Sequence, residues 1–272
     1  MTGTMTTAGT ATSADGTTIA YEVSGSGPAL VLVDGAMCHR ELGPSRGMAA
    51  ALAGSFTVCA YDRRGRGGSG PGSTTYTPER EVEDMVAVVE AVGGHAHVFS
   101  ASSGAALALE AARQGAPLDR LIAYEAPFVV DDTRPPNDPR LPERVQEMVD
   151  RGRRAEAVRT FLRTVGVPSP VVALMHLMPA WRRMTAIAHT LPYDLSMVVP
   201  HQQGRPLPEG CYDAVTAPTL VLAGGRSPAW MRHAQAAVAA AVPDSRLETL
   251  PGQTHMIKPA AVAPVVTEFL LG

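Results

Sequence analysis

Short apolar runs recur along the chain and are separated by longer segments with helical spacing. Each run is hydrophobic at successive positions, which is typical of strands buried on both faces of a parallel sheet. The longer segments begin with proline or acidic residues, or end in glycine, and these are start and stop signals of helices. The predicted strands span residues 17–23, 28–35, 55–62, 95–100, 118–127, 217–225 and 245–250, and the predicted helices span 78–94, 104–115, 228–242 and 259–272.

This alternation predicts an α/β fold in which a mostly parallel sheet is covered by helices on both faces. It is interrupted between residues 127 and 216, where the chain is rich in proline and has helical stretches. We therefore expect a helical cap at 127–216, inserted into a core formed by residues 13–126 and 217–272. Residues 1–12 are mostly Thr, Ala and Gly, and they are predicted to be a disordered leader.

Composition and charge narrow the classes of partner. The 272 residues include 23 Lys and Arg against 26 Asp and Glu, so the basic surface that nucleic-acid binding uses is not expected. No apolar run approaches the roughly 18 residues of a membrane span, and the first 20 residues lack a secretory signal, which favours a cytoplasmic protein. The cysteines Cys38, Cys59 and Cys211 are too few and too scattered for a disulfide framework or a structural zinc site.

The most informative segment joins the predicted strand at 95–100 directly to the helix at 104–115. Small residues at Ser100, Gly104 and Ala105 allow a sharp turn between strand and helix, with Ser102 at its tip. This arrangement is typical of the nucleophile elbow, G-x-S-x-G, with a serine in the first glycine position. Ser102 is therefore the candidate nucleophile.

Five segments, in this order, resemble motifs of the α/β-hydrolase superfamily: VLVDGAM, YDRRGRGGSG, SASSGA, YEAP and LPGQTHMIKP. The resemblance covers about residues 15–272 and implies an α/β-hydrolase fold, with nucleophile, acid and histidine in that chain order. His255, in the last segment, matches the family's histidine on the loop after the final strand. The resemblance implies that His255 removes the proton of Ser102 and later protonates the leaving group.

The acid that should accompany these two residues is not at its usual place. The family commonly has aspartate after the strand that follows the cap, in a pattern like G-x-x-D-P, whereas this chain has Ser227 there. Some members, including haloalkane dehalogenases, place the acid at the end of the strand before the cap, and Glu125 occupies that place. We therefore predict Glu125 as the acid, with its pairing to a cap arginine as the alternative. Asp131 and Asp132 are weaker candidates, expected in a turn or a helix cap.

Two backbone N–H groups are predicted to form the oxyanion hole, those of Ala36 and Ser103. Ser103 lies at the N-terminus of the predicted helix at 104–115, and Ala36 follows the strand at 28–35. Where the family commonly has His-Gly before this donor, the chain has Asp34-Gly35. A buried carboxylate at a strand end needs a partner, so we expect Asp34 to be structural and to pair with an arginine of the RRGRG loop.

An apolar stripe at helical spacing lies in the predicted cap and consists of Met175, Met178, Trp181 and Met184. A stripe of this kind is typical of a helix core. In an inserted cap it would equally line an adaptable apolar pocket. The predicted pocket residues are Met37, Met175, Met178, Trp181 and Trp230.

The sequence therefore predicts a hydrolase of small molecules. A serine nucleophile favours cleavage of an ester, thioester or lactone with an apolar body through an acyl-enzyme, and it argues against dehalogenation or epoxide opening. Two alternatives stay open. The same site would also suit carbon–carbon bond cleavage or cyclisation of a natural-product intermediate, and a protein with an eroded triad would bind a ligand without turnover.

No cofactor or metal is expected. Gly65, Gly67 and Gly70 satisfy G-x-G-x-x-G, but the residues that follow cannot continue the helix that a dinucleotide site requires. His95 and His97 share one face of a strand without a third ligand spaced with them. The expected partner is a small-molecule substrate, and the sequence does not indicate an oligomeric state.

Overall fold

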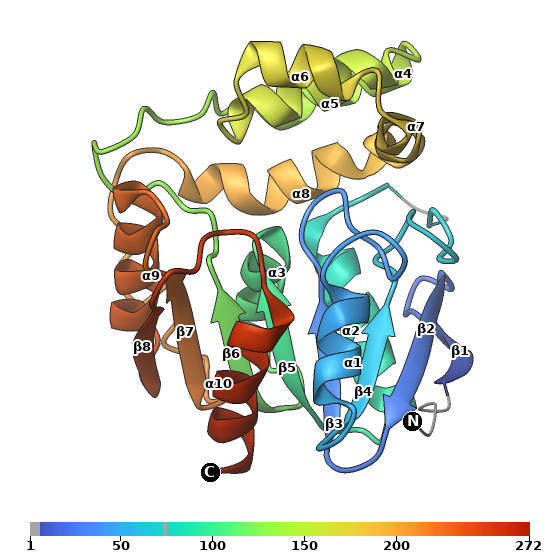
Figure 1. The fold of residues 1–272 in the computed structure, drawn as a ribbon, viewed down its shortest axis with the longest axis vertical. Coiled ribbons are helices and arrows are strands. Elements are labelled where there is room, and N and C mark those ends of the chain that lie inside the picture. The colour runs from blue at the N-terminus through green and yellow to red at the C-terminus, as the bar shows by residue number, and fades with distance from the viewer. Residues whose placement is uncertain (1–5, 73–74) are drawn as a thin grey trace.

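The computed structural model describes residues 6–72 and 75–272, and these residues form one sheet with the strand order β1-β2-β4-β3-β5-β6-β7-β8 (Figure 1). β2 pairs antiparallel with β1 and β4, and the remaining pairs are parallel. The predicted mostly parallel sheet is therefore confirmed. The strands are β1 (Thr6–Thr12), β2 (Thr18–Gly25), β3 (Ala29–Val33), β4 (Thr57–Tyr61), β5 (Ala96–Ala101), β6 (Leu118–Tyr124), β7 (Thr219–Gly224) and β8 (Ser245–Leu250).

Helices cover both faces of the sheet, as the continuous apolar strands require. In β3, Val31 and Val33 belong to the core on one face, and Leu30 and Leu32 belong to the core on the other. The first face is covered by α2 (Pro78–Ala91), α3 (Ser103–Arg113) and α9 (Ala229–Ala241). The second face is covered by α1 (Ser45–Leu52) and α10 (Pro259–Leu271), of which α1 has no counterpart among the predicted helices.

The prediction of a disordered leader was wrong for residues 6–12. These residues form β1, which pairs antiparallel with β2 from Thr6↔Ser24 to Thr12↔Thr18. The pairing needs backbone hydrogen bonds rather than apolar side chains, and Gly16 makes the intervening turn with a positive φ of 81°. Composition alone therefore misled the prediction. Residues 1–5 of the predicted leader lie outside the described residues.

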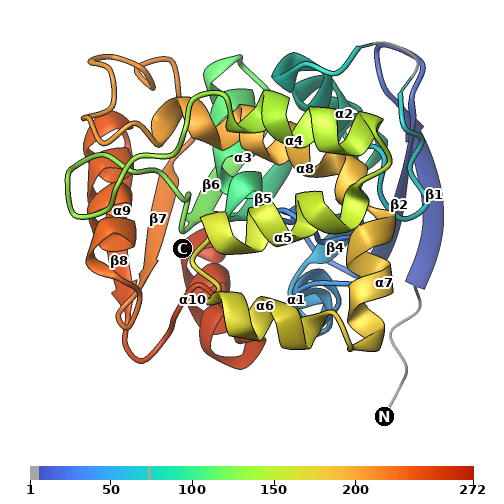
Figure 2. The same cartoon turned by 90° about the horizontal axis from the view of Figure 1, so that it is seen from above.

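Between β6 and β7 the chain forms a helical layer over the end of the sheet where the parallel strands finish (Figure 1). α8 lies nearest the sheet, with α4, α5 and α6 farther out (Figure 1). Seen from above, α4 lies over α8, and α5 and α6 lie to one side of it (Figure 2). α8 contacts α2 and α3 of the core. This layer falls within the predicted cap. That the cap is a separate unit with the bounds 127–216 stays a prediction. Its helices are α4 (Leu141–Asp150), α5 (Arg154–Thr164), α6 (Ser169–Met175), α7 (Pro179–Ala186) and α8 (Leu191–Val198), with short 3-10 helices at Ala188–Thr190 and Val199–His201.

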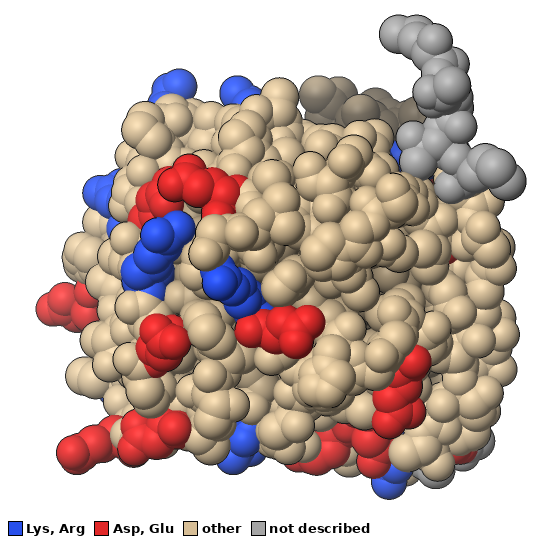
Figure 3. Space-filling view, turned by 90° about the horizontal axis from the view of Figure 1, so that it is seen from below, with Lys and Arg blue, Asp and Glu red and all other residues tan. Residues whose placement is uncertain are grey.

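The face opposite the helical layer shows acidic and basic side chains interspersed among uncharged ones (Figure 3). Mixed charges on this face agree with the small net charge of the chain. Of the helices in the described ranges, none has both the length and the apolar character needed to cross a bilayer. The site described next lies at the other end of the sheet, beneath the helical layer.

Candidate active site

Ser102 stands at the tip of a strained turn between β5 and α3. Its backbone has φ 56° and ψ −129°, a conformation that costs a non-glycine residue about 1–3 kcal/mol and persists only where the surroundings enforce it. Glycines permit the close approach: a Cβ on Gly104 would lie 2.4 Å from the carbonyl oxygen of Val33, and one on Gly35 would lie 2.8 Å from Cβ of Ser102. The Ser102 N–H donates to the carbonyl of Tyr124 at 2.9 Å. Neighbouring strands therefore hold the hydroxyl at the exposed tip.

The structure brings Ser102, His255 and Glu125 into one hydrogen-bonded chain. His255 lies on the loop between β8 and α10, with its Nε2 3.1 Å from Oγ of Ser102. Its Nδ1 lies 2.9 Å from Oε2 of Glu125. Because a carboxylate only accepts hydrogen bonds, Nδ1 carries the proton and Nε2 is left to accept from the serine hydroxyl. This is the geometry in which an imidazole removes a proton from a hydroxyl.

Glu125 follows β6 directly and is fully buried. Its backbone has φ 49°, again a strained value for a non-glycine residue. The second carboxylate oxygen, Oε1, accepts the N–H of Gly224 at 2.7 Å, so each oxygen of the buried carboxylate has a partner. The partner of Glu125 is therefore the histidine and not a cap arginine.

The other candidate acids are elsewhere. Asp131 forms a turn in which its Oδ1 accepts the N–H of Thr133, and its Oδ2 lies 2.5 Å from Nδ1 of His233. Asp132 is exposed. Ser227 is buried, and in the described part of the chain its hydroxyl has no hydrogen-bond partner. The place of the family's usual aspartate is thus filled by a side chain that does not bond to the histidine.

The two predicted oxyanion donors both border the candidate nucleophile. Ser103 is the first residue of α3, so no carbonyl of its own helix is available to its N–H. Ala36 lies in the loop after β3, and both residues line the same cavity as Ser102 and His255. The next residue, Met37, has φ 62°, so this loop is also held in a strained conformation. The role of Ala36 and Ser103 as oxyanion donors stays a prediction.

Two cavities meet at Ser102 and His255. The first, of about 210 Å³, lies beneath the helical layer and has apolar walls that include Phe161, Val165 and Leu195. The second, of about 410 Å³, is lined in part by Cys38, Pro44, Met256 and Ile257. Ala36, Ser102 and His255 line both cavities, so the two cavities adjoin at the candidate nucleophile.

Of the predicted pocket residues, only Trp230 lines one of these cavities. The predicted stripe is not one helix face, because α6 ends at Met175 and α7 begins after Met178. Trp181 is buried among the helices of the layer, and Met178 is 52% exposed. Met37 is buried in the core. The pocket prediction was therefore wrong for Met37, Met175, Met178 and Trp181.

The predicted pairing of Asp34 with an arginine of the loop after β4 was also wrong. Arg63 donates to the backbone carbonyl of Asp34 at 3.2 Å, but the ion pairs of Arg63 and Arg66 go to other carboxylates. Oδ2 of Asp34 is buried without a hydrogen-bond partner among the described residues. Burial raises the pKa of Asp34 to about 6, although the nearby arginines act in the opposite direction.

We expect Asp34→Asn to stabilise the protein at neutral pH. The folded-state pKa of Asp34 is raised from 3.8 to about 6. The protonated carboxyl group therefore favours the folded state below pH 4, and this contribution to the free energy of unfolding is lost as the pH rises through 6. A shift of this size corresponds to about 3 kcal/mol at pH 8. Urea unfolding at pH 4 and pH 8 measures the difference between Asp34→Asn and the native chain. A difference that is the same at both pH values would contradict this prediction, and the exposed Asp213→Asn is the control.

Arg63 and Arg66 of the loop after β4 belong to a buried network of ion pairs that was not predicted from the sequence. Asp194 of α8 accepts from Arg63 at 2.7 Å, from Arg66 at 2.6 Å and from the hydroxyl of Ser103 at 2.7 Å. All four side chains are buried, and Arg63 pairs in addition with Glu81 of α2. Burial alone would raise the pKa of Asp194, but the two arginines outweigh it and lower that pKa. The sequence signal for this network is Asp194 itself, a lone acid in the mainly apolar stretch LPYDLSMVV.

Asp194→Asn is expected to lower the free energy of unfolding by about 3–5 kcal/mol, because among the described residues it leaves the buried Arg66 without a carboxylate partner and Arg63 with Glu81 alone. The network joins the helical layer to the turn that holds Ser102, so we also expect reduced activity. Urea unfolding checks the stability. The matched control is Asp138→Asn, which breaks an exposed ion pair with Arg144 and is expected to change the free energy of unfolding very little. Equal losses in the two variants would contradict the prediction.

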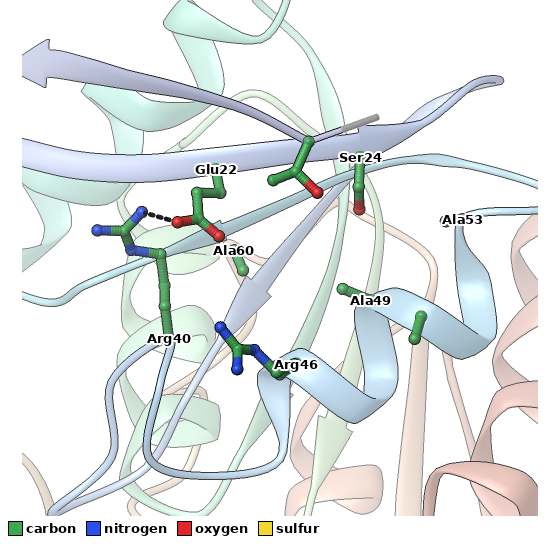
Figure 4. A pocket seen from close by; sticks show the side chains of 9 residues that line it. Glu22, Ser24, Arg40, Arg46, Ala49, Ala53 and Ala60 are labelled. Carbon is green, nitrogen blue, oxygen red and sulfur yellow. Dashed lines mark ion pairs between the residues drawn. The ribbon is translucent and has the colours of Figure 1, made fainter. Parts of the chain in front are cut away.

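A further hollow lies away from this site, between β2 and α1 (Figure 4). It has a volume of about 290 Å³, and Arg40 at its wall forms ion pairs with Glu22 and Asp62. Its lining includes none of the residues of the hydrogen-bonded chain. Among residues 6–72 and 75–272, no group of three His, Cys, Asp or Glu side chains is arranged to hold a metal ion.

Comparison with known proteins identifies the family to which this chain is similar. The model of the alpha/beta hydrolase family matches residues 26–265. A solved alpha/beta hydrolase from Sphaerobacter thermophilus is 46% identical, with a TM-score of 0.85 over 96% of this chain and 100% of that chain.

Two more distant structures show the fold alone. A hydrolase from Pseudomonas aeruginosa is 21% identical with a TM-score of 0.71, and a thermophilic esterase from Thermogutta terrifontis is 23% identical with a TM-score of 0.68. Each alignment covers 97% of this chain and 98% of the other. A comparison with curated proteins found no match. The family match over nearly the whole chain and the 46% identical relative together establish that this chain belongs to the alpha/beta hydrolase family.

Proposed function

We propose that this protein is a cofactor-free serine hydrolase that cleaves a carboxylic ester, thioester or lactone of a small, largely apolar molecule. The observation that carries the proposal is the chain of hydrogen bonds from Ser102 through His255 to the buried Glu125. A serine hydroxyl is a weak nucleophile unless a base takes its proton as it attacks. In the proposed mechanism His255 is that base, and Glu125 fixes its tautomer.

The proposed reaction has two halves. Ser102 Oγ attacks the substrate carbonyl while Nε2 of His255 takes the hydroxyl proton, and the oxyanion is stabilised by the N–H groups of Ala36 and Ser103. The carbon–oxygen or carbon–sulfur bond then breaks, and His255 protonates the leaving group. In the second half, His255 deprotonates a water that attacks the acyl group on Ser102, and the acid is released. Glu125 stabilises the imidazolium that forms in each half.

The chemistry and shape of the site support acyl transfer over the other reactions of the fold. An aspartate at position 102 would form an alkyl-enzyme, whereas a serine forms an acyl-enzyme. The cavity of about 210 Å³ suits a small substrate, and its walls are mainly apolar. Ser227 alone would favour an inactive, ligand-binding protein. The carboxylate of Glu125 at 2.9 Å from His255 supports an active enzyme instead.

A fluorophosphonate probe tests the proposal, because it reacts with serines that an adjacent base activates. We expect one adduct per chain, located by mass spectrometry on the peptide that contains Ser102, and no adduct on Ser102→Ala. Ser227→Ala is the control and should be labelled like the native chain. Labelling that survives in Ser102→Ala would overturn the proposed nucleophile.

A further inference from the structure

Arg134 brings a positive charge into the cavity that also contains Ser102 and His255. It lies in the connection between β6 and α4, and its guanidinium stacks over the ring of Trp230, 4.3 Å from the ring centroid. It donates one hydrogen bond to the backbone carbonyl of Thr164 at the end of α5. Within the described ranges, no carboxylate reaches it at ion-pair distance, 4.0 Å.

The other permanently charged side chain of this cavity wall in the described chain is already compensated, because Asp194 pairs with two arginines. Arg134 is therefore the one permanently charged group of the cavity wall, in the described chain, that lacks an opposite charge. Burial of its side chain lowers the pKa of Arg134, which shows that desolvation there is not offset by a neighbouring acid.

A guanidinium in this setting is suited to bind a carboxylate. It presents five N–H donors in one plane, and the carbonyl of Thr164 uses only part of them. The guanidinium carbon lies 4.3 Å from the centroid of the Trp230 ring, so the aromatic ring packs against the guanidinium and N–H donors remain for a two-point contact with a carboxylate. The apolar walls of the cavity strengthen such a contact by excluding water.

We propose that Arg134 binds a carboxylate of the substrate, so that the preferred substrate is a small ester, thioester or lactone that also carries a free carboxylate group. This inference rests on the proposed function of the same site. The carboxylate-bearing part occupies the cavity of Arg134, and the remaining, apolar part extends into the second cavity beside Cys38 and Met256. Arg134 is then a specificity-determining residue, and the chemistry stays with Ser102.

A purely structural role makes a different prediction. If Arg134 serves only to fasten the end of α5 through Thr164, its loss lowers stability and affects all substrates alike. The decisive readout is therefore the ratio of kcat/KM for two esters that differ in whether a second carboxyl group is free or methylated. Mono-p-nitrophenyl glutarate carries the carboxylate, and its methyl ester is the neutral counterpart.

The native chain is expected to prefer the charged ester. Arg134→Gln should lower kcat/KM for mono-p-nitrophenyl glutarate roughly 10- to 100-fold, mainly through KM, as expected for loss of a hydrogen bond to a charged group. The same variant should leave kcat/KM for the methyl ester within about threefold, within the usual spread for such substitutions. Arg134→Lys keeps the positive charge but loses the planar set of N–H donors. Its kcat/KM for mono-p-nitrophenyl glutarate should therefore fall between the values of the native chain and of Arg134→Gln. The control is Arg144→Gln, whose ion pair with Asp138 is exposed and outside the cavity.

The outcomes separate the two proposals. If the native chain hydrolyses both esters equally, or Arg134→Gln lowers both equally, the carboxylate proposal is overturned while the serine hydrolase proposal stands. If neither ester is hydrolysed and the fluorophosphonate probe does not label Ser102, both proposals fail. A loss restricted to the charged ester, with a thermal midpoint close to that of Arg144→Gln, supports the assignment.

Discussion

Replacing Ser102 by alanine is expected to lower kcat for an activated ester about 10⁴- to 10⁶-fold, the range in which removal of a serine nucleophile falls. The hydroxyl lies 3.1 Å from Nε2 of His255, and no other hydroxyl bonds to that nitrogen in the described chain. Ser103, its neighbour, already donates its hydroxyl to Asp194. Steady-state hydrolysis of a p-nitrophenyl ester measures the loss.

The fold of Ser102→Ala should be unchanged. Alanine meets the same strain as serine at φ 56°, and the hydroxyl has no hydrogen-bond partner other than His255 among the described residues. The thermal midpoint of the variant should therefore stay within a few degrees of the native value, as expected for a change of about 1 kcal/mol or less. Retention of more than a tenth of the native kcat would contradict the assignment of Ser102.

Glu125→Gln is expected to lower kcat about 10³- to 10⁴-fold, because the acid both fixes the histidine tautomer and stabilises the imidazolium. Glutamine has the same size and keeps an oxygen for the N–H of Gly224. Its neutral amide cannot balance the charge that His255 acquires, and its NH₂ group favours the wrong tautomer when it faces Nδ1. KM should change much less than kcat, since Glu125 is buried behind the histidine and does not line the cavity.

Asp131→Asn is the matched control for this prediction. Asp131 was a competing candidate for the acid, but its carboxylate contacts His233 and the backbone of Thr133. We expect the kcat of Asp131→Asn to stay within threefold of native, within the usual spread for a surface substitution. A large loss in Asp131→Asn together with little loss in Glu125→Gln would show that the acid has been assigned to the wrong residue.

The strands and the turn at Ser102 were predictable because their cause is local. A strand such as β3 is buried on both faces, so every residue from Leu30 to Val33 is apolar, and that pattern is visible without any tertiary information. The turn at Ser102 requires small residues at fixed offsets for the same steric reason that the structure shows at Gly104. The place of Glu125 after the next strand follows from the parallel pairing of β5 and β6.

The features that the sequence did not predict depend on contacts between distant segments. Arg63 and Arg66 find their partner in Asp194, about 130 positions away, and no spacing rule connects them. Asp34 was expected to pair with those arginines, because a strand-end motif does not reveal that their ion pairs go to other carboxylates and that Oδ2 of Asp34 lacks a hydrogen-bond partner among the described residues. The apolar stripe from Met175 to Met184 has helical spacing, but the break before Pro179 divides it between two helices.

In the proposed mechanism, Ser102 carries the acyl group of the substrate during turnover. Rapid quenching of the native enzyme with a p-nitrophenyl ester, followed by mass spectrometry of the intact chain and its peptides, tests this claim directly. We expect a burst of p-nitrophenol and a chain heavier by the acyl group, with the added mass on Ser102. Turnover of the ester at the native rate without any acylated chain, at times when deacylation is incomplete, would contradict it.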